Sequence, residues 1–294
     1  MLSIIVTAYR EPKTIKVAID SIQKQISHED EVLVICPDPE TVKSVEELKN
    51  QYKNIILFKD ERKGKPAALN IGLRHAKGEI IVLTDGDVFL ESNAIPMLVK
   101  NLYLDKNIGA VCGHPISLNS KNTILGYWSH ALTNILNNNR KLLSKQNRYI
   151  QCSGYLYAIR AGIVDSIPEN SLADDAVISY KVHEAGYRIA YEEEALVKVK
   201  YPLNYYDWLK QKTRSTAGHT QAEIYKPEKN NRSFLGEIGQ GGLSVILFAT
   251  NPKEFFWSSL LLLARLHVWG LIFYKVKIKN EPLLKLWTPV ESTK

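Results

Sequence analysis

Apolar runs and amphipathic stretches alternate along the first part of the chain. The apolar runs are short and rich in β-branched residues, which predicts strands buried on both faces of a sheet. They cover residues 2–6, 31–35, 55–58 and 80–83. Between them, apolar residues recur at helical spacing, in a helix that Pro12 opens and in helices over 42–48 and 66–76. This alternation predicts an α/β fold with a single doubly wound, mostly parallel sheet.

An acidic pair follows the fourth of these strands, where Asp85 and Asp87 flank Gly86. Carboxylate oxygens suit Mg²⁺ or Mn²⁺, which keep open positions for phosphate oxygens. Gly86 would let the backbone approach a ligand closely. The pair therefore indicates a divalent metal site, although Asp-Gly is also a common turn dipeptide.

The topology brings further loops to the same place. In doubly wound sheets, ligands bind beyond the carboxyl ends of the strands. We therefore expect segments 7–11, 36–40 and 59–65 to gather beside the acidic pair. The basic run Arg62-Lys63-Gly64-Lys65 would then face the metal, which suits a metal-bound diphosphate. A solvated loop is the alternative interpretation of that run.

Charge and cysteine content narrow the class of partner. The 294 residues carry a net charge of +7, which favours an anionic partner such as a nucleotide or a phospholipid surface. The basic residues are scattered along the chain, so we expect no nucleic-acid role. Residues 3–7 lack the length and preceding basic segment of a secretory signal, and the three cysteines show no metal-like spacing. We therefore expect a reduced, cytoplasmic setting.

The middle of the chain contains a second acidic pair. A strand over 108–112, a helix over 125–143 and a strand over 151–160 with a turn at Gly154 precede it. Asp174 and Asp175 then open a helix over 171–186. Acids at a helix amino terminus can simply cap it and stabilise its dipole. Alternatively, one of them is a general base that removes the proton from a substrate hydroxyl.

The C-terminal part contains a long apolar stretch over 255–274. It approaches the length of a spanning helix, but Arg265 near its centre costs roughly 2.5–3.5 kcal/mol on insertion scales. Its aromatic residues and the following Lys275, Lys277 and Lys279 favour an in-plane helix on an anionic membrane surface. A true span and a helix buried in the protein are the alternatives.

Three ordered motifs resemble glycosyltransferase family 2, whose members are inverting sugar-nucleotide transferases with one Rossmann-like domain. The motifs are Ser3-Ile-Ile-Val-Thr-Ala-Tyr-Arg-Glu11, Lys63-Gly-Lys-Pro-Ala-Ala-Leu-Asn-Ile-Gly-Leu73 and Gly78-Glu-Ile-Ile-Val-Leu-Thr-Asp-Gly-Asp87. The resemblance implies a glycosyltransferase A type of fold. It implies a nucleotide site lined by Thr7, Tyr9 and Glu11, with Lys65 near the donor. It also implies that Asp85 contacts the ribose or the metal and that Asp87 binds the metal on the diphosphate.

The acidic pair of the middle segment also resembles this family, whose second acid is the general base. The resemblance assigns that role to Asp175 and leaves Asp174 and Gly154 as acceptor-side or supporting residues. Asp38, in Cys36-Pro37-Asp38, stands where family members carry an Asp-Asp pair that holds the base.

A later segment resembles the membrane-associated, synthase-like branch of the family. Its Gln-x-x-Arg-Trp motif is matched by Gln211 and Arg214, while Ser215 replaces the tryptophan. Arg214 would suit a diphosphate contact through its bidentate fork. His219 is a candidate further metal ligand, although a lone histidine is more often merely hydrogen-bonded.

These observations together predict an inverting, metal-dependent hexosyltransferase with Mn²⁺ or Mg²⁺ as cofactor. The donor would be a UDP-sugar rather than a GDP-sugar, and the acceptor a lipid-linked or glycan hydroxyl at the cytoplasmic membrane face. The transferase domain would cover 1–225, with a donor half over about 1–115 and an acceptor half over about 116–225. A helical extension would cover 226–294. A nucleotidyltransferase acting on a sugar phosphate and a non-catalytic nucleotide-binding module are the alternatives.

Overall fold

The computed structural model describes residues 1–218, 241–280, 290 and 292–293 of the chain. These residues form two compact units, each described here by itself. The first unit contains Met1–Ile116 and Arg140–Val199, and the second contains Ser117–Asn139 and Lys200–Lys294. The predicted domain boundary at residue 225 lies outside the described residues. The predicted domain ranges therefore stay predictions.

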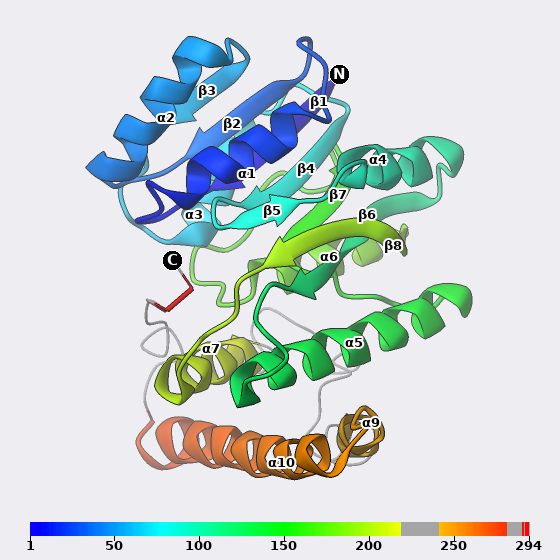
Figure 1. Cartoon of the computed structure of the whole chain (residues 1–294). Helices are drawn as coiled ribbons and strands as arrows, with labels where there is room; N and C mark the ends of the chain where they lie inside the picture. Colours follow the sequence, from blue (N-terminus) through cyan, green and yellow to red (C-terminus); the bar gives the residue numbers. More distant parts are fainter. Residues whose placement is uncertain (219–240, 281–289, 291, 294) are drawn as a thin grey trace. The chain divides into compact units, whose positions relative to one another are not determined.

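The first unit is built on one eight-stranded sheet (Figure 1). Its strands are β1 (Leu2–Thr7), β2 (Glu31–Ile35), β3 (Ile55–Phe58), β4 (Ile80–Asp85), β5 (Val88–Leu90), β6 (Ile108–Ser117), β7 (Leu156–Arg160) and β8 (Arg188–Val199). Their spatial order is β3-β2-β1-β4-β7-β6-β8-β5. The pairs β2–β3, β1–β2 and β1–β4 are parallel. Strand β7 is antiparallel to both β4 and β6, and β5 is antiparallel to β8. The predicted α/β fold is confirmed, as a mixed sheet whose early strands are parallel.

Helices pack on this sheet through apolar faces at helical spacing. They are α1 (Thr14–Gln23), α2 (Pro39–Gln51), α3 (Lys65–His75), α4 (Ala94–Leu104) and α6 (Asp174–Glu184). Helix α5 (Ile124–Lys145) has residues in both units. In α1, for example, Ile15, Ala18, Ile19 and Ile22 are buried, as an amphipathic helix requires. Helix α3 packs on β1 and β2, and α6 packs on β8. Helices α1, α2 and α3 follow the parallel strands β1, β2 and β3, so the loops that precede these three helices open at the carboxyl ends of those strands.

Two elements of the first unit were not predicted from the sequence. Strand β5 has three residues, too few for a periodic pattern to stand out. Helix α4 follows Asn93, which adopts a left-handed conformation with φ of 67°. Its buried face of Ala94, Ile95, Leu98 and Leu102 packs against β7 and β8. The segment that follows Asp87, which contains β5 and α4, thus packs on the sheet.

The second unit is helical, with α7 (Tyr205–Gly218), α9 (Gly242–Leu247), α10 (Pro252–Ile272) and a π-helical turn over Phe273–Ile278. Its core joins Trp128, Trp208, Trp257 and Leu261. The Trp128 indole Nε1 donates to the Trp257 carbonyl at 2.8 Å. The Tyr127 and Ser258 hydroxyls lie 2.8 Å apart in the same interior.

Helix α10 and the turn after it also have an exposed apolar side. Phe255, Phe256, Leu263, Leu266 and Phe273 are exposed, whereas Leu261 and Val268 are fully buried. Within the part of the chain that the structure describes, Pro252–Lys275 is the one helix long and apolar enough to cross a membrane by length and composition. Core helices of soluble proteins meet the same test, so the predicted membrane contact stays a prediction.

Candidate active site

The predicted acidic pair begins at the carboxyl end of β4. Because β1 and β4 are parallel neighbours, Thr7 and Asp85 stand opposite each other at the ends of their strands. The Thr7 hydroxyl donates to Asp85 Oδ1 at 3.0 Å. Lys65 Nζ lies 2.7 Å from the same oxygen. The structure thus brings these three predicted donor-site residues together at one edge of the sheet.

Lys65 connects the two acidic pairs. It is the first residue of α3 and follows Gly64, whose φ of 101° favours glycine. Its Nζ lies 3.5 Å from Asp174 Oδ2 as well as 2.7 Å from Asp85 Oδ1. Burial opposes its charge, but Asp174, Asp85 and Asp175 together raise the pKa of Lys65 above its ordinary value. Lys65 is therefore a fixed cation at working pH, placed among carboxylates from β4 and α6.

Asp175 lies on the first turn of α6 and is held by backbone amides. The Gly154 N–H donates to its Oδ2 at 2.9 Å, and the Ala176 N–H donates to its Oδ1 at 2.8 Å. Burial and the neighbouring Asp174 raise the pKa of Asp175, while Lys65 and the two amides oppose that rise. A partly exposed carboxylate with a raised pKa is suited to accept a proton. This environment fits the role predicted for Asp175 and places Gly154 and Asp174 beside it.

The turn after Asp85 is packed against the loop that follows β1. A Cβ atom on Gly86 would lie 2.7 Å from both Ala8 Cβ and Glu11 Oε2, so only glycine fits there. The Glu11 carboxylate therefore lies against the turn that carries Asp87. The Glu11 N–H in turn donates to Thr41 Oγ1 at 2.8 Å, which fixes this loop on α2.

The donor set at this turn fits a divalent cation. Mg²⁺ and Mn²⁺ sites on nucleotides need only one or two protein carboxylates, because phosphate oxygens and water supply the rest. Asp85 and the half-buried Asp87 provide two, and Gly86 keeps the backbone close. Among the described residues, no group of three or more histidine, cysteine or acidic side chains forms a metal cage of its own. Both metal ligands thus stay a prediction that the carboxylate chemistry supports.

Asp38 has a well-defined structural role. It caps α2, accepting from the Thr41 N–H at 3.0 Å and from the Thr41 hydroxyl at 2.7 Å. It also accepts from the Arg10 N–H at 2.8 Å, where the backbone is left-handed with φ of 56°. Burial opposes ionisation, but these hydrogen bonds lower the pKa of Asp38. The carboxylate thereby shapes the loop that carries Tyr9, over whose ring the Arg10 guanidinium lies at 5.3 Å. Contact of Asp38 and Tyr9 with a nucleotide stays a prediction.

The remaining predicted residues belong to the second unit or lie outside the description. Gln211 and Arg214 lie on α7, and Gln211 Oε1 is buried without a hydrogen-bond partner among the described residues. Their predicted contact with the donor stays a prediction. His219 lies outside the described residues.

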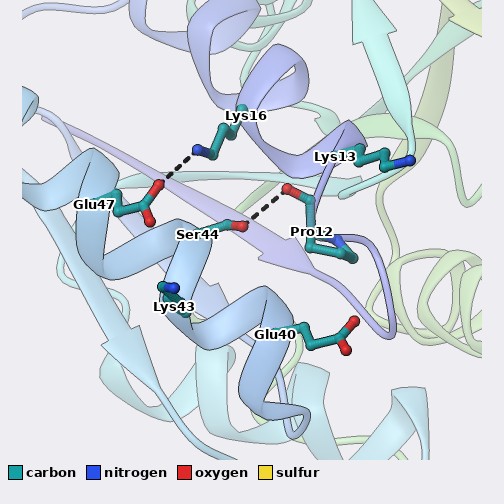
Figure 2. A pocket seen from close by; sticks show the side chains of 7 residues that line it. All are labelled: Pro12, Lys13, Lys16, Glu40, Lys43, Ser44 and Glu47. Atoms are coloured by element: carbon teal, nitrogen blue, oxygen red, sulfur yellow. Dashed lines mark hydrogen bonds and ion pairs between the residues drawn. The ribbon is translucent and has the colours of Figure 1, made fainter.

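A separate depression of about 560 Å³ lies between α1 and α2. Figure 2 shows its lining residues, which include Lys16, Ser44 and Glu47. Lys16 pairs with Glu47 at 2.6 Å, and the Ser44 hydroxyl donates to the Pro12 carbonyl at 2.9 Å. These polar groups hold the two helices together, so we place the chemistry at the acidic cluster instead.

Ligands of an open α/β sheet bind beyond the carboxyl ends of its strands, and a lysine and metal-binding carboxylates there suit a transferase that uses a nucleotide-activated donor. Comparison with known families is consistent with that class. The family model described as glycosyl transferase family 2 matches residues 3–165, more than half of the chain. The chain therefore belongs to glycosyltransferase family 2.

Curated relatives are distant and longer. The chain is 25% identical over 227 residues to a poly-beta-1,6-N-acetyl-D-glucosamine synthase of Staphylococcus aureus (strain COL), covering 74% of this chain and 54% of the relative. It is 27% identical over 165 residues to the probable glycosyltransferase YdaM of Bacillus subtilis (strain 168), covering 53% and 38%. The chain thus spans about half the length of the first relative and a smaller share of the second.

Solved structures share the fold. The mannosyltransferase PcManGT from Pyrobaculum calidifontis, in complex with GDP-Man and Mn²⁺, aligns with a TM-score of 0.61 at 21% identity. That alignment covers 98% of this chain and 82% of the other. Residues 1–349 of S. aureus TarS, in complex with UDP-GlcNAc, align with a TM-score of 0.53 at 16% identity, covering 97% and 86%. At these identities the likeness shows the glycosyltransferase A type of fold and nothing finer.

Proposed function

We propose that this enzyme transfers a sugar from a UDP-sugar to the hydroxyl group of a lipid-linked or glycan acceptor at the cytoplasmic membrane face. We place this reaction at the two acidic pairs. The main support for this placement is that the Lys65 ammonium group contacts both Asp85 of one pair and Asp174 of the other. One cation thereby links the predicted donor side of the site to the residue beside Asp175.

The chemistry follows from the placement of the two pairs. The acceptor oxygen attacks the anomeric carbon while the Asp175 carboxylate takes the hydroxyl proton. The bond between the anomeric carbon and the diphosphate oxygen breaks, and the nucleoside diphosphate leaves with the electron pair. A divalent cation held by Asp87 and Asp85 would supply charge stabilisation for that diphosphate. Lys65 adds a fixed positive charge beside Asp85, and no second acid is needed to protonate the leaving group.

The choice of donor is supported by the relatives. The synthase of S. aureus is named for an N-acetylglucosamine polymer, and the TarS structure contains UDP-GlcNAc. The PcManGT structure contains GDP-Man and Mn²⁺. We therefore propose UDP-GlcNAc as the first donor to test, with GDP-mannose as the comparison and Mn²⁺ or Mg²⁺ as the cofactor.

The membrane assignment is supported by the second unit. The exposed side of α10 carries Phe255 and Phe256, and the exposed Phe273 follows the helix with Lys275 and Lys279. Exposed aromatic side chains beside lysines suit an anionic lipid surface. A lipid-linked acceptor would be presented at such a surface.

The test measures nucleoside diphosphate release from UDP-GlcNAc and GDP-mannose with Mn²⁺, Mg²⁺ or EDTA, with and without a membrane lipid extract. The variants Asp175→Asn and Asp87→Asn stand beside Asp165→Asn, a control at an exposed carboxylate. We expect metal-dependent release that the first two substitutions abolish and the control retains. Retained donor binding in Asp175→Asn would place that residue in the chemistry.

Other products would contradict the proposal. Pyrophosphate release from a nucleoside triphosphate and a sugar phosphate would indicate a nucleotidyltransferase. Nucleotide binding that ignores metal, without turnover under any condition, would indicate a binding module.

A further inference from the structure

Three consecutive backbone amides before β7 each donate to a side chain. The Cys152 N–H donates to Ser179 Oγ at 2.9 Å, and the Ser153 N–H donates to Cys112 Sγ at 3.3 Å. The third amide is that of Gly154, which donates to Asp175 Oδ2 at 2.9 Å. We call residues 152–154 the amide segment. Its direction is fixed by two buried side chains, and its last member holds the carboxylate.

The Ser179 side chain forms hydrogen bonds with both the amide segment and the first turn of α6. Its hydroxyl donates to the Asp175 carbonyl at 2.6 Å and accepts from the Cys152 N–H at 2.9 Å. It lies one helical turn after Asp175 and is fully buried. A hydroxyl has one hydrogen, and Ser179 donates it to the Asp175 carbonyl. A lone pair of the same oxygen accepts the hydrogen bond from the Cys152 N–H. The first turn of α6 and the amide segment therefore share one buried atom.

We infer that Ser179 is a positioning residue for Asp175, acting through the amide segment. The inference rests on the proposed function, in which Asp175 is the general base. Ser179 is fully buried, so we assign it no contact with the reacting hydroxyl or the sugar. It sets the orientation of the Gly154 amide, and that amide sets the orientation of the carboxylate.

Removing the hydroxyl would have a directed effect. The Cys152 N–H would lose its acceptor in a buried place, which forces the amide segment to move or to leave a donor unsatisfied. Cys112 would still accept a hydrogen bond from the amide segment, but its sulfur is a weak acceptor at a longer distance. A weakened Gly154 hydrogen bond stabilises the charged carboxylate less, so the pKa of Asp175 would rise further.

The test compares Ser179→Ala with the wild type by kcat, donor KM and the pH profile of kcat. We expect kcat to fall roughly 10- to 100-fold, as a small misplacement of a reacting group does. Donor KM should change by less than about twofold. The base acts when deprotonated, so activity falls as pH falls through its pKa. The acid limb of the profile should therefore move to higher pH.

Two further serine variants separate positioning from general loss of structure. Ser179→Thr keeps the hydroxyl and should restore most of kcat and the acid limb of the wild type. Ser3→Ala removes another fully buried hydroxyl, which donates to Glu31 at 2.6 Å and accepts from the Gly78 N–H at 2.8 Å. It should cost stability and leave the pH profile unchanged.

The outcomes distinguish this inference from the proposed function. If the Asp175→Asn enzyme is active, Asp175 is not the general base, and both the assignment and this inference are wrong. An inactive Asp175→Asn beside a Ser179→Ala enzyme of wild-type kcat and pH profile would overturn the inference alone. If Ser179→Ala does not fold, Cys112→Ala takes its place, because it removes the weaker holder of the same segment. A smaller shift of the acid limb to higher pH would then support the inference, and an unshifted profile would overturn it.

Discussion

Replacing Lys65 with methionine removes one charge from the centre of the site at nearly constant length. The ammonium group lies 2.7 Å from Asp85 Oδ1 and 3.5 Å from Asp174 Oδ2. In the variant these two carboxylates, with Asp175 beside them, would repel one another without the Lys65 ammonium group between them. We therefore expect a lower free energy of unfolding. The size of the decrease should depend on how deeply these side chains are buried.

The exposed fractions of the three side chains give that size. They are 29% for Lys65, 20% for Asp85 and 14% for Asp174, between a surface pair and a fully buried one. Surface pairs contribute 0–1 kcal/mol, and removing one partner of a buried pair costs 3–5 kcal/mol. We therefore expect a loss of about 2–3 kcal/mol. That corresponds to a decrease in Tm of roughly 4–12 °C for a domain of this size.

Thermal unfolding followed by circular dichroism in EDTA measures this loss without ligand or metal. The control is Lys16→Met, because Lys16 pairs with Glu47 at a similar distance of 2.6 Å but both side chains are about half exposed. We expect no resolvable change in its Tm. Equal decreases for the two variants would refute the reasoning that burial decides. A double variant, Lys65→Met with Asp85→Asn, should lose less than the sum of the single losses.

The effect should not depend on pH in the ordinary working range. The neighbouring carboxylates raise the pKa of Lys65 in the folded protein above the unfolded value of about 10.4. A raised lysine pKa means that the stabilisation is fully present below the unfolded pKa and is lost as pH rises through the folded pKa. The difference in Tm between wild type and variant should therefore be constant from about pH 7 to pH 9.

The other predictions concern a glycine, a buried hydroxyl and the base. Gly86→Ala should cost about 1–3 kcal/mol by overpacking and weaken donor binding, measured by unfolding and calorimetry. Its control, Gly270→Ala, meets open space and should not destabilise the helix. Ser258→Ala should cost about 1–3 kcal/mol, because the buried Tyr127 hydroxyl loses its partner; an unchanged Tm would contradict this. The acid limb of kcat should lie at higher pH than the titration of an ordinary aspartate, since burial and Asp174 raise the pKa of Asp175.

Periodicity alone located most of the parallel half of the sheet. The strands over 31–35 and 55–58 have the predicted bounds, since short β-branched runs between helices have few alternatives. Topology then brought Lys65 to Asp85, because loops after parallel strands meet at one edge. The family resemblance, rather than any pattern, singled out Asp175 from its neighbour.

The support around Asp175 could not be predicted in the same way. Residues 151–160 have a strand-like pattern, but the strand begins only at Leu156, and 152–154 form the amide segment. The hydrogen bond from Gly154 to Asp175 joins residues 21 positions apart and depends on where β7 enters the sheet. The one local signal was Ser179, placed one helical turn after Asp175. A serine there is also common on ordinary helices, so the signal has meaning only beside the structure.

The place of β7 in the sheet also constrains how the enzyme forms in time. This strand lies between β4 and β6, although it follows both in the chain. During synthesis, the edge of β4 therefore stays unpaired until residues 156–160 have emerged. An open strand edge can associate with other chains, and non-local pairing of this kind is slow. We therefore expect a nascent fragment ending before β7 to hold the donor loops yet to depend on chaperones for its solubility.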